Sequence, residues 1–109
     1  MTTAFGNFSH AEGWDTIASG RSQHTQGEFS ILDPDANPDN PDKRGKYAHI
    51  VGNGTDDERR SNAHTLDWSG NAWFAGNVYI GGTGQDDPNA KTIIQAVLDA
   101  LPIYNGEVE

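Results

Sequence analysis

The chain has 109 residues, enough for one domain, and its 16 acidic against 7 basic residues give a formal net charge of −9. This charge argues against nucleic acid or an anionic membrane surface as a partner. The absence of cysteine excludes disulfides, and no apolar run reaches the ~18 residues of a membrane span. Leu, Ile, Val and Phe supply only 19 residues, about 17% of the chain. The composition therefore leaves a largely disordered chain or a thin repetitive fold that borrows burial from partner chains.

Glycine recurs every seven residues in the N-terminal quarter, at Gly6, Gly13, Gly20 and Gly27. Within each unit, small residues precede the glycine at alternate positions. Alternation with a period of two is typical of a strand, and a glycine at the end of the unit is typical of a tight turn. Residues 1–27 are therefore predicted to form a β-roll, a β-helix-like stack of short strands.

The same alternation predicts which side chains point into this stack. The inward residues are expected to be small: Ser9, Ala11, Thr16, Ala18 and Thr25. A core of such residues buries little apolar area, and at about 25 cal/mol per Å² it does not stabilise a free monomer.

Several stretches resemble known proteins. The run Ser-His-Ala-Glu-Gly at residues 9–13, with its counterparts at 17–20 and 23–27, resembles the head repeat of trimeric autotransporter adhesins. It is still more similar to repeats in tail-fibre and minor structural proteins of phages that infect Gram-positive bacteria. Residues 46–55 and 60–76, the latter including Asn-Ala-His-Thr-Leu-Asp-Trp, are similar to the phage group only.

The resemblance implies an intertwined homotrimer, rich in β-structure, at the distal end of a virion fibre, and it implies no catalytic residues. The expected fold class is accordingly mainly β: a homotrimeric β-roll or β-helix-like fibre with a β-hairpin cassette and one short C-terminal helix. The expected repeat and trimer core consists of Ala11, Gly13, Ala18, Gly20, Thr25 and Gly27.

Residues 28–46 form an acidic, proline-rich segment that is predicted to be a loop, because its prolines exclude a helix or a central strand. Its oxygen-bearing side chains have the stagger of a calcium loop: Asp33, Asp35, Asn37 and Asp39. Pro38 stands where such a loop needs glycine, and Arg44 stands where it needs glutamate. A solvated, proline-stiffened surface loop is therefore expected, which also suits contact with a receptor. The alternative is a weak Ca²⁺ site, and no other cofactor is expected.

Residues 47–82 are predicted to form a β-hairpin cassette, with strands at 47–51, 62–68 and 72–75 and a turn at 69–71. The charged stretch 56–60 is expected to be a solvated loop. The large apolar residues expected to form the core of the cassette, shared across the trimer axis, are Leu66, Trp68, Trp73, Val78 and Ile80. For Trp68 and Trp73 two interpretations stay open: packing in this core, or ligand binding by stacking on sugars.

The four histidines are expected to have structural roles. His10 and His24 are two repeat units apart, so they are predicted to share an outward face beside Glu12 and Gln26. No His-x-His or His-x₃-His pair supports a metal site. His49 and His64 are expected to make structural hydrogen bonds.

Residues 83–109 are predicted to be a linker followed by a helix over 90–101, with Asp87 as N-cap and Pro88 in the first turn. The helix is expected to pack through Ile94, Val97 and Leu101. A short helix is marginal alone, so this stripe needs cover. The cover is either a three-helix bundle on the trimer axis or the hairpin of the same chain.

No catalytic motif is present in the sequence. The absence of such a motif predicts a non-enzymatic protein, and the resemblance to phage fibre proteins implies a structural and receptor-binding module of a phage tail fibre, located on the virion or otherwise extracellular. The expected partners are two further copies of the chain and a host glycan or surface protein. The alternatives are a fragment of a polysaccharide-degrading tail spike and an architectural filament subunit.

Overall fold

The structure, a computed structural model, describes residues 1–101 of the chain. It divides the chain into unit 1, Met1–Ala75, and unit 2, Gly76–Glu109, whose residues 102–109 lie outside the described part. Strands predominate among the described residues, so the expectation of a mainly-β protein is confirmed. Because the division follows Ala75, residues 76–82, which the sequence groups with the hairpin, belong to unit 2.

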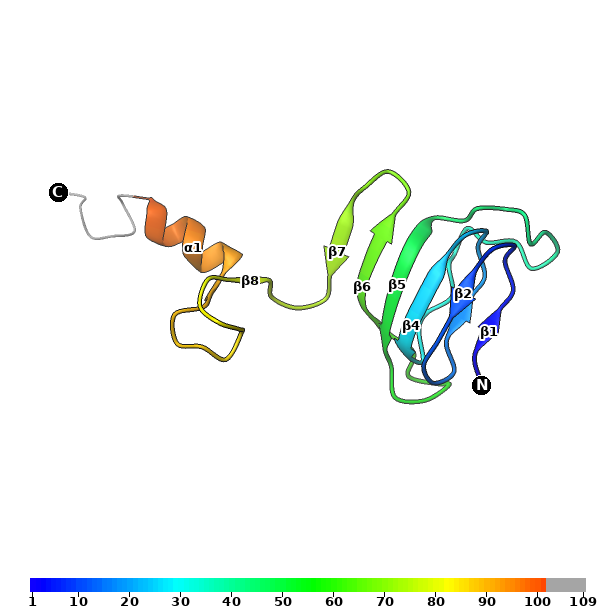
Figure 1. Cartoon of the computed structure of the whole chain (residues 1–109), viewed down its shortest axis with the longest axis horizontal. Coiled ribbons are helices and arrows are strands. Elements are labelled where there is room, and N and C mark those ends of the chain that lie inside the picture. Colours follow the sequence, from blue (N-terminus) through cyan, green and yellow to red (C-terminus); the bar gives the residue numbers. More distant parts are fainter. Residues whose placement is uncertain (102–109) are drawn as a thin grey trace. The chain divides into compact units, whose positions relative to one another are not determined.

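Unit 1 contains two sheets (Figure 1). The smaller sheet consists of β1 (Thr3–Ala4) and β3 (Ile17–Ala18). The larger sheet has the strand order β2 (His10–Ala11), β4 (His24–Glu28), β5 (Tyr47–Asn53), β6 (Asn62–Asp67) and β7 (Ala72–Phe74). In this sheet β2, β4 and β5 run parallel, whereas β6 and β7 form an antiparallel hairpin against β5.

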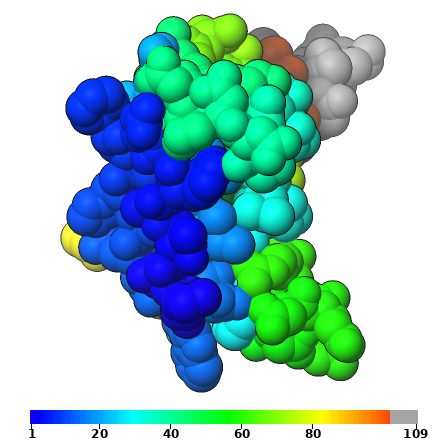
Figure 2. Space-filling view, turned by 90° about the vertical axis from the view of Figure 1, so that its right-hand side faces the viewer, coloured from blue at the N-terminus to red at the C-terminus, as the bar shows by residue number. Residues whose placement is uncertain are grey.

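The seven-residue spacing of the sequence becomes a spacing of two heptads between paired strands. Thr3 on β1 lies beside Ile17 on β3, and His10 on β2 lies beside His24 on β4. Successive heptads therefore supply strands to the two sheets in turn. The 28–46 segment interrupts the spacing but not the pairing, since β5 continues the parallel stack beside β4. Figure 2 shows the N-terminal residues, in blue, at the surface where this stack ends.

The glycines lie in columns where neighbouring backbones approach closely. Gly27 and Gly52 are paired across β4 and β5, and a Cβ on Gly27 would collide with the carbonyl oxygen of Gly52. Gly13, one step earlier in this column, and Gly27 have φ angles of 102° and 98°, which L side chains rarely adopt. Close approach and backbone conformation together explain the glycine period. The residue two positions after each N-terminal glycine also has positive φ: Phe8, Asp15, Ser22 and Phe29.

The core of unit 1 is small and mostly polar. Among the described residues, Ala18 and Ile50 are the buried hydrophobic side chains. The buried polar side chains are Thr16, Gln23, Thr25, Ser30, Asp33, Asn62 and Thr65. The predicted inward positions around β3 and β4 are therefore confirmed, whereas Ser9 and Ala11, near the edge strand β2, are only half-buried.

Residues 29–46 form a loop, since Glu28 still belongs to β4, and this loop is not solvated throughout. The buried carboxylate of Asp33 accepts hydrogen bonds from the backbone N–H groups of Lys46 and Tyr47, each at 2.9 Å from Oδ2. It also accepts a hydrogen bond from Gln23 Nε2 at 2.7 Å, and Gln23 donates to the Tyr47 carbonyl oxygen as well. A buried carboxylate is tolerated only when it is paired in this way. The network therefore ties the loop to the start of β4 and of β5.

The apolar core predicted for the hairpin cassette is not buried within one chain: Leu66, Trp68 and Val78 are half-buried, and Trp73 and Ile80 are exposed. The expected sharing of this core across a trimer axis stays a prediction. Val78 and Ile80 moreover lie in unit 2. Trp73 lies on β7, an edge strand with a neighbour on one side only, so an apolar side chain there lacks the cover that a central strand provides.

Unit 2 contains an antiparallel strand pair and a helix: β8 (Tyr79–Ile80), β9 (Lys91–Thr92) and α1 (Ile93–Ala100). The prediction of a helix that begins at residue 90 with Asp87 as N-cap is wrong. Thr92 is the N-cap, and its Oγ1 accepts a hydrogen bond from the Gln95 N–H at 3.1 Å. Asp87 instead accepts from the N–H groups of Thr83 and Asn89 and closes a turn before β9.

The apolar stripe of α1 lies at the surface of the described chain. Ile94 and Val97 are 70% and 54% exposed, and Leu101, directly after the helix, is 42% exposed. Both predicted ways of covering this stripe stay predictions. No helix within residues 1–101 has the length and apolar character needed to cross a bilayer.

Candidate functional site

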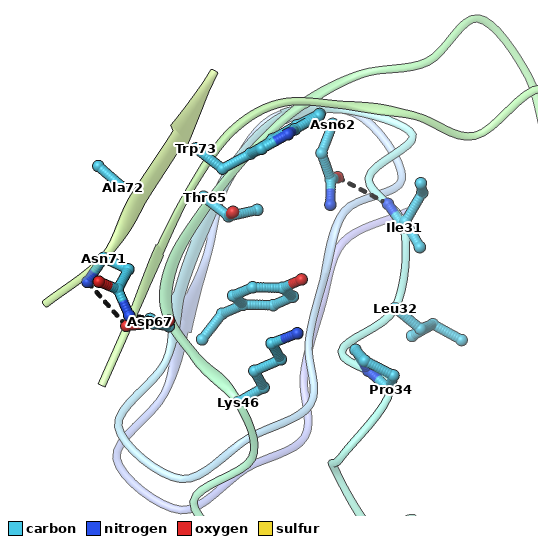
Figure 3. A pocket seen from close by; sticks show the side chains of 11 residues that line it. Ile31, Leu32, Pro34, Lys46, Asn62, Thr65, Asp67, Asn71, Ala72 and Trp73 are labelled. Carbon is cyan, nitrogen blue, oxygen red and sulfur yellow. Dashed lines mark hydrogen bonds between the residues drawn. The ribbon is translucent and has the colours of Figure 1, made fainter. Parts of the chain in front are cut away.

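A pocket of about 400 Å³ beside Trp73 is the candidate functional site of unit 1 (Figure 3). Its apolar lining comes from the start of the 28–46 loop and from β5 and β7: Ile31, Leu32, Pro34, Tyr47, Ala72 and Trp73. An open pocket with aromatic walls and a few polar groups is the usual form of a site for a small ligand.

Strand register explains the position of Trp73. β5, β6 and β7 place Ile50, Thr65 and Trp73 in one row across the sheet. Ile50 and Thr65 are buried in the core, whereas Trp73, on the edge strand, is 52% exposed. The last residue of this row, Trp73, therefore lies outside the core, and its indole ring lines the pocket.

Polar groups complete the lining of the pocket. Asn62 Oδ1 accepts a hydrogen bond from the Ile31 N–H at 2.9 Å, which orients the amide (Figure 3). Asp67 accepts hydrogen bonds from the backbone N–H groups of Asn71 and Ser69, at 2.8 and 2.9 Å, and from the Asn71 side-chain amide. These contacts, the Asn71 backbone N–H above all, lower the pKa of Asp67. The pocket therefore carries an oriented amide and a charged carboxylate next to its aromatic wall.

Trp68, the other tryptophan predicted to bind a ligand, lies outside this pocket. Its ring faces the Arg44 guanidinium at 3.9 Å, and its Nε1 donates to the Arg44 carbonyl oxygen at 3.3 Å. It lines a separate hollow together with Phe8 and Arg21. The structure thus separates the two tryptophans, and Trp68 holds the end of the 28–46 loop.

A row of aromatic rings crosses the opposite face of the larger sheet. This ring row takes one ring from each strand: His10, His24, His49, His64 and Phe74. Successive ring centroids are 5.0, 4.9, 5.9 and 4.4 Å apart. Burial first, and then the charges of His24 and His64, lower the pKa of His49. His64 Nδ1 donates to the Trp73 carbonyl oxygen at 3.0 Å, so the expected structural hydrogen bond is present.

Glu12 lies against the N-terminal end of the ring row. Its Oε1 is 3.2 Å from His24 Nε2, and its Oε2 is 3.8 Å from His10 Nε2. Within residues 1–101, these three residues are the one group of three or more His, Asp or Glu side chains whose ligand atoms lie within 4.8 Å of one another. The predicted shared face of His10 and His24 is confirmed. Residue spacings within one strand do not reveal this cluster, because its contacts join side chains of the neighbouring strands β2 and β4.

Among the predicted calcium ligands, Asp33, Asp35 and Asp39 do not bring three carboxylate oxygens within 4.8 Å of one another in the described chain. The side chain of Asp33 belongs to the loop network, and its Oδ1 also accepts the Asp35 N–H at 2.9 Å. Asn37 Oδ1 accepts the Asp39 N–H at 2.8 Å in the same way. Turns in which an Asp or Asn side chain binds the backbone two residues later explain this spacing of oxygen-bearing residues without a metal.

Arg60 has a structural role, although the sequence places it in a solvated loop. Its guanidinium donates to Asp15 Oδ2 at 2.6 Å and to the carbonyl oxygens of Asp15 and Ser30 at 3.1 Å. It therefore links the segment before β6 to the chain at Asp15 and at Ser30. Asp15 and Arg60 are 45 residues apart, so no local pattern reveals the pair.

The described residues thus form a mainly-β protein with an aromatic pocket on one face of its larger sheet and a histidine-rich row on the other. No model of a protein family matches the chain, and no curated protein or solved structure matches it significantly. The resemblance to phage fibre proteins stays a prediction.

Proposed function

We propose that this chain is a non-enzymatic structural and receptor-binding module of a phage tail fibre, which attaches the virion to a glycan on the host surface. The observation that carries the binding role is the exposed indole of Trp73, which lines a pocket together with Tyr47, Asn62 and Asp67. The C–H faces of sugar rings pack on aromatic side chains, and sugar hydroxyls bond to amides and carboxylates. A carbohydrate is therefore the ligand class that fits this lining.

The proposed architecture is an intertwined homotrimer built on a β-roll. The parallel pairing of heptads and the glycine columns support the roll. The exposed apolar stripe of α1 supports the sharing of apolar surface between chains, since Ile94 and Val97 are 70% and 54% exposed in one chain. A contiguous exposed apolar stripe of this kind is typical of a protein interface.

Sedimentation equilibrium of the purified chain tests the trimer. A trimer of the 11.8-kDa chain has a mass of about 35 kDa. A folded species that stays at 11.8 kDa across micromolar concentrations would contradict the proposed assembly.

Binding of the purified chain to bacterial cell-wall polysaccharides tests the receptor role. Trp73→Ala is expected to weaken binding by at least about tenfold, because a tryptophan at the centre of a binding site contributes heavily. Trp14→Ala is the matched control, since Trp14 is also exposed, at 61%, and packs on Phe29 away from the pocket lining. Equal binding by the two variants would remove the pocket from the proposal.

A further inference from the structure

Three side chains of metal-ligating type meet at the N-terminal end of the ring row. His10 and His24 are direct neighbours on the parallel strands β2 and β4. Glu12 follows His10 by two residues, so it projects from the same face. The parallel register therefore brings together residues that the sequence separates by up to fourteen positions.

The spacing of these side chains is close to that of a metal site. With Zn–N and Zn–O bonds of about 2.0–2.2 Å, a tetrahedral zinc ion holds its ligand atoms about 3.3 Å apart. Glu12 already lies 3.2 Å from His24 and 3.8 Å from His10, and all the ligand atoms lie within 4.8 Å of one another. The three side chains are 40–65% exposed, so small rotations complete the approach without repacking the core. Solvent can supply the remaining ligand.

The chemistry of the donors selects the class of ion. Two imidazoles and one carboxylate form a set that Zn²⁺ and its neighbours in the first transition row prefer, whereas Ca²⁺ and Mg²⁺ prefer oxygen donors throughout. We propose that His10, Glu12 and His24 bind a divalent transition-metal ion of the Zn²⁺ class, which clamps β2 to β4. This inference is independent of the proposed receptor binding.

The neighbouring strand pair, β4 and β5, provides an internal comparison. Gln26 occupies on β4 the position that corresponds to Glu12 after β2, and its Oε1 lies 3.2 Å from His49 Nε2. The arrangement is thus repeated, but with a neutral amide in place of the carboxylate. An amide oxygen is a much poorer ligand for Zn²⁺ than a carboxylate, so the site is confined to the pair β2 and β4.

Metal binding has a structural consequence at the end of the stack. β2 is a two-residue edge strand that pairs with β4 alone in its sheet. An ion held by one residue of β4 and two residues on or beside β2 stabilises this pairing, and an ion that binds only the folded chain raises its melting temperature.

Zn²⁺ titration of the full chain, by calorimetry and by competition with a chromogenic chelator, tests the site. We expect one ion per chain and a melting temperature that rises with Zn²⁺ and falls again with EDTA. Glu12→Gln and His10→Ala are each expected to weaken binding by at least about tenfold, since even residues behind a ligand contribute on that scale. His64→Ala is the control, because His64 belongs to the ring row but not to the cluster.

A relocation variant sharpens the test. Glu12→Gln combined with Gln26→Glu moves the carboxylate from the β2 side to β4, beside His24 and His49. This double variant is expected to recover Zn²⁺ binding, and that binding should depend on His49 rather than on His10. Circular dichroism confirms that each variant is folded. The proposal is overturned if the wild-type chain binds no Zn²⁺, if Glu12→Gln and His10→Ala bind as well as wild type, or if one ion binds per three chains, which would place it on a three-fold axis.

Discussion

Unit 1 and unit 2 stabilise their segments of chain in different ways. Unit 1 closes a core within one chain, using glycine columns, short parallel strands and a buried polar network around Asp33. In the described part of unit 2 no side chain is buried, and an amphipathic eight-residue helix follows a two-strand pair. Close backbone packing with paired polar groups can therefore replace a thick aliphatic core, whereas a short helix still needs another surface to cover it.

This contrast also assigns different roles to the two units. The pocket beside Trp73 and the proposed metal cluster both lie in unit 1, where register holds side chains at defined positions. The uncovered stripe of unit 2 is the part of the chain that a trimer would use most directly. Substitutions in the two units test whether close backbone packing and the polar network around Asp33 stabilise unit 1.

The largest effect is expected from a methyl group in a glycine column. Gly27→Ala and Gly70→Ala both place a side chain at positive φ, 98° and 91°, but only the first meets a neighbour, the Gly52 carbonyl oxygen. We expect the free energy of unfolding to fall by about 3 kcal/mol or more for Gly27→Ala and by about 1–2 kcal/mol for Gly70→Ala. Urea unfolding followed by tryptophan fluorescence measures both. Equal losses would show that close approach contributes nothing.

The next effect is expected from the loop network. Asp33→Ala leaves the N–H groups of Lys46 and Tyr47 and the Gln23 amide without their acceptor, and it should lower the free energy of unfolding by about 2–4 kcal/mol. Asp39→Ala, in the exposed part of the same loop, should change it by less than about 0.5 kcal/mol. If the loop bound calcium, Ca²⁺ would stabilise the wild-type chain and both variants would lose that response, which the same urea titration, run with and without Ca²⁺, can detect.

A smaller effect is expected from overfilling the core. Ala18 is completely buried, so Ala18→Leu should lower the melting temperature of unit 1 through a cost of about 1–3 kcal/mol. Ala100→Leu adds the same atoms at an exposed position of α1, where about 0.5 kcal/mol or less is expected. Calorimetric melting of both variants tests the contrast between the units directly. Unchanged melting of Ala18→Leu would mean that the strand stack has room that the structure does not show.

The smallest effect is expected from acid. The pKa of Asp67 lies below its ordinary value of 3.8, chiefly because the Asn71 N–H stabilises the carboxylate. Asp67 therefore takes up its proton at a higher pH in the unfolded chain than in the folded chain. The stability that the ionised carboxylate contributes is complete above pH 3.8 and is lost as the pH falls through the folded-state pKa.

Asp67→Asn should accordingly lose less stability than wild type between neutral pH and pH 3, as urea midpoints would show. Asp87, in a turn of unit 2, has a pKa lowered in the same manner, chiefly by the Asn89 N–H. Asp87→Asn should leave the acid dependence of unit 1 unchanged. If wild type and Asp67→Asn lost the same stability in acid, other carboxylates would be responsible for the effect.

Local sequence patterns are sufficient to predict the short elements of unit 1. The glycine period and the small-residue alternation predicted short strands and the inward positions of Thr16, Ala18 and Thr25, and the hairpin turn at residues 69–71 followed from Ser-Gly-Asn. These features depend on backbone conformation and side-chain alternation over a few residues, which a sequence displays directly. The sequence also indicates Trp73 as a candidate ligand contact, because aromatic side chains at a fibre tip can stack on sugars.

Contacts between residues far apart in the sequence follow from the tertiary structure alone. It placed Asp33 in a buried network instead of a calcium loop, paired Arg60 with Asp15, and separated Trp68 from the pocket of Trp73. It also brought Glu12 to both His10 and His24. All but the Glu12 contacts involve residues within or beyond the 28–46 segment, which interrupts the seven-residue spacing, so that spacing does not predict them. Side chains far apart in the sequence become partners only when backbone pairing sets them side by side.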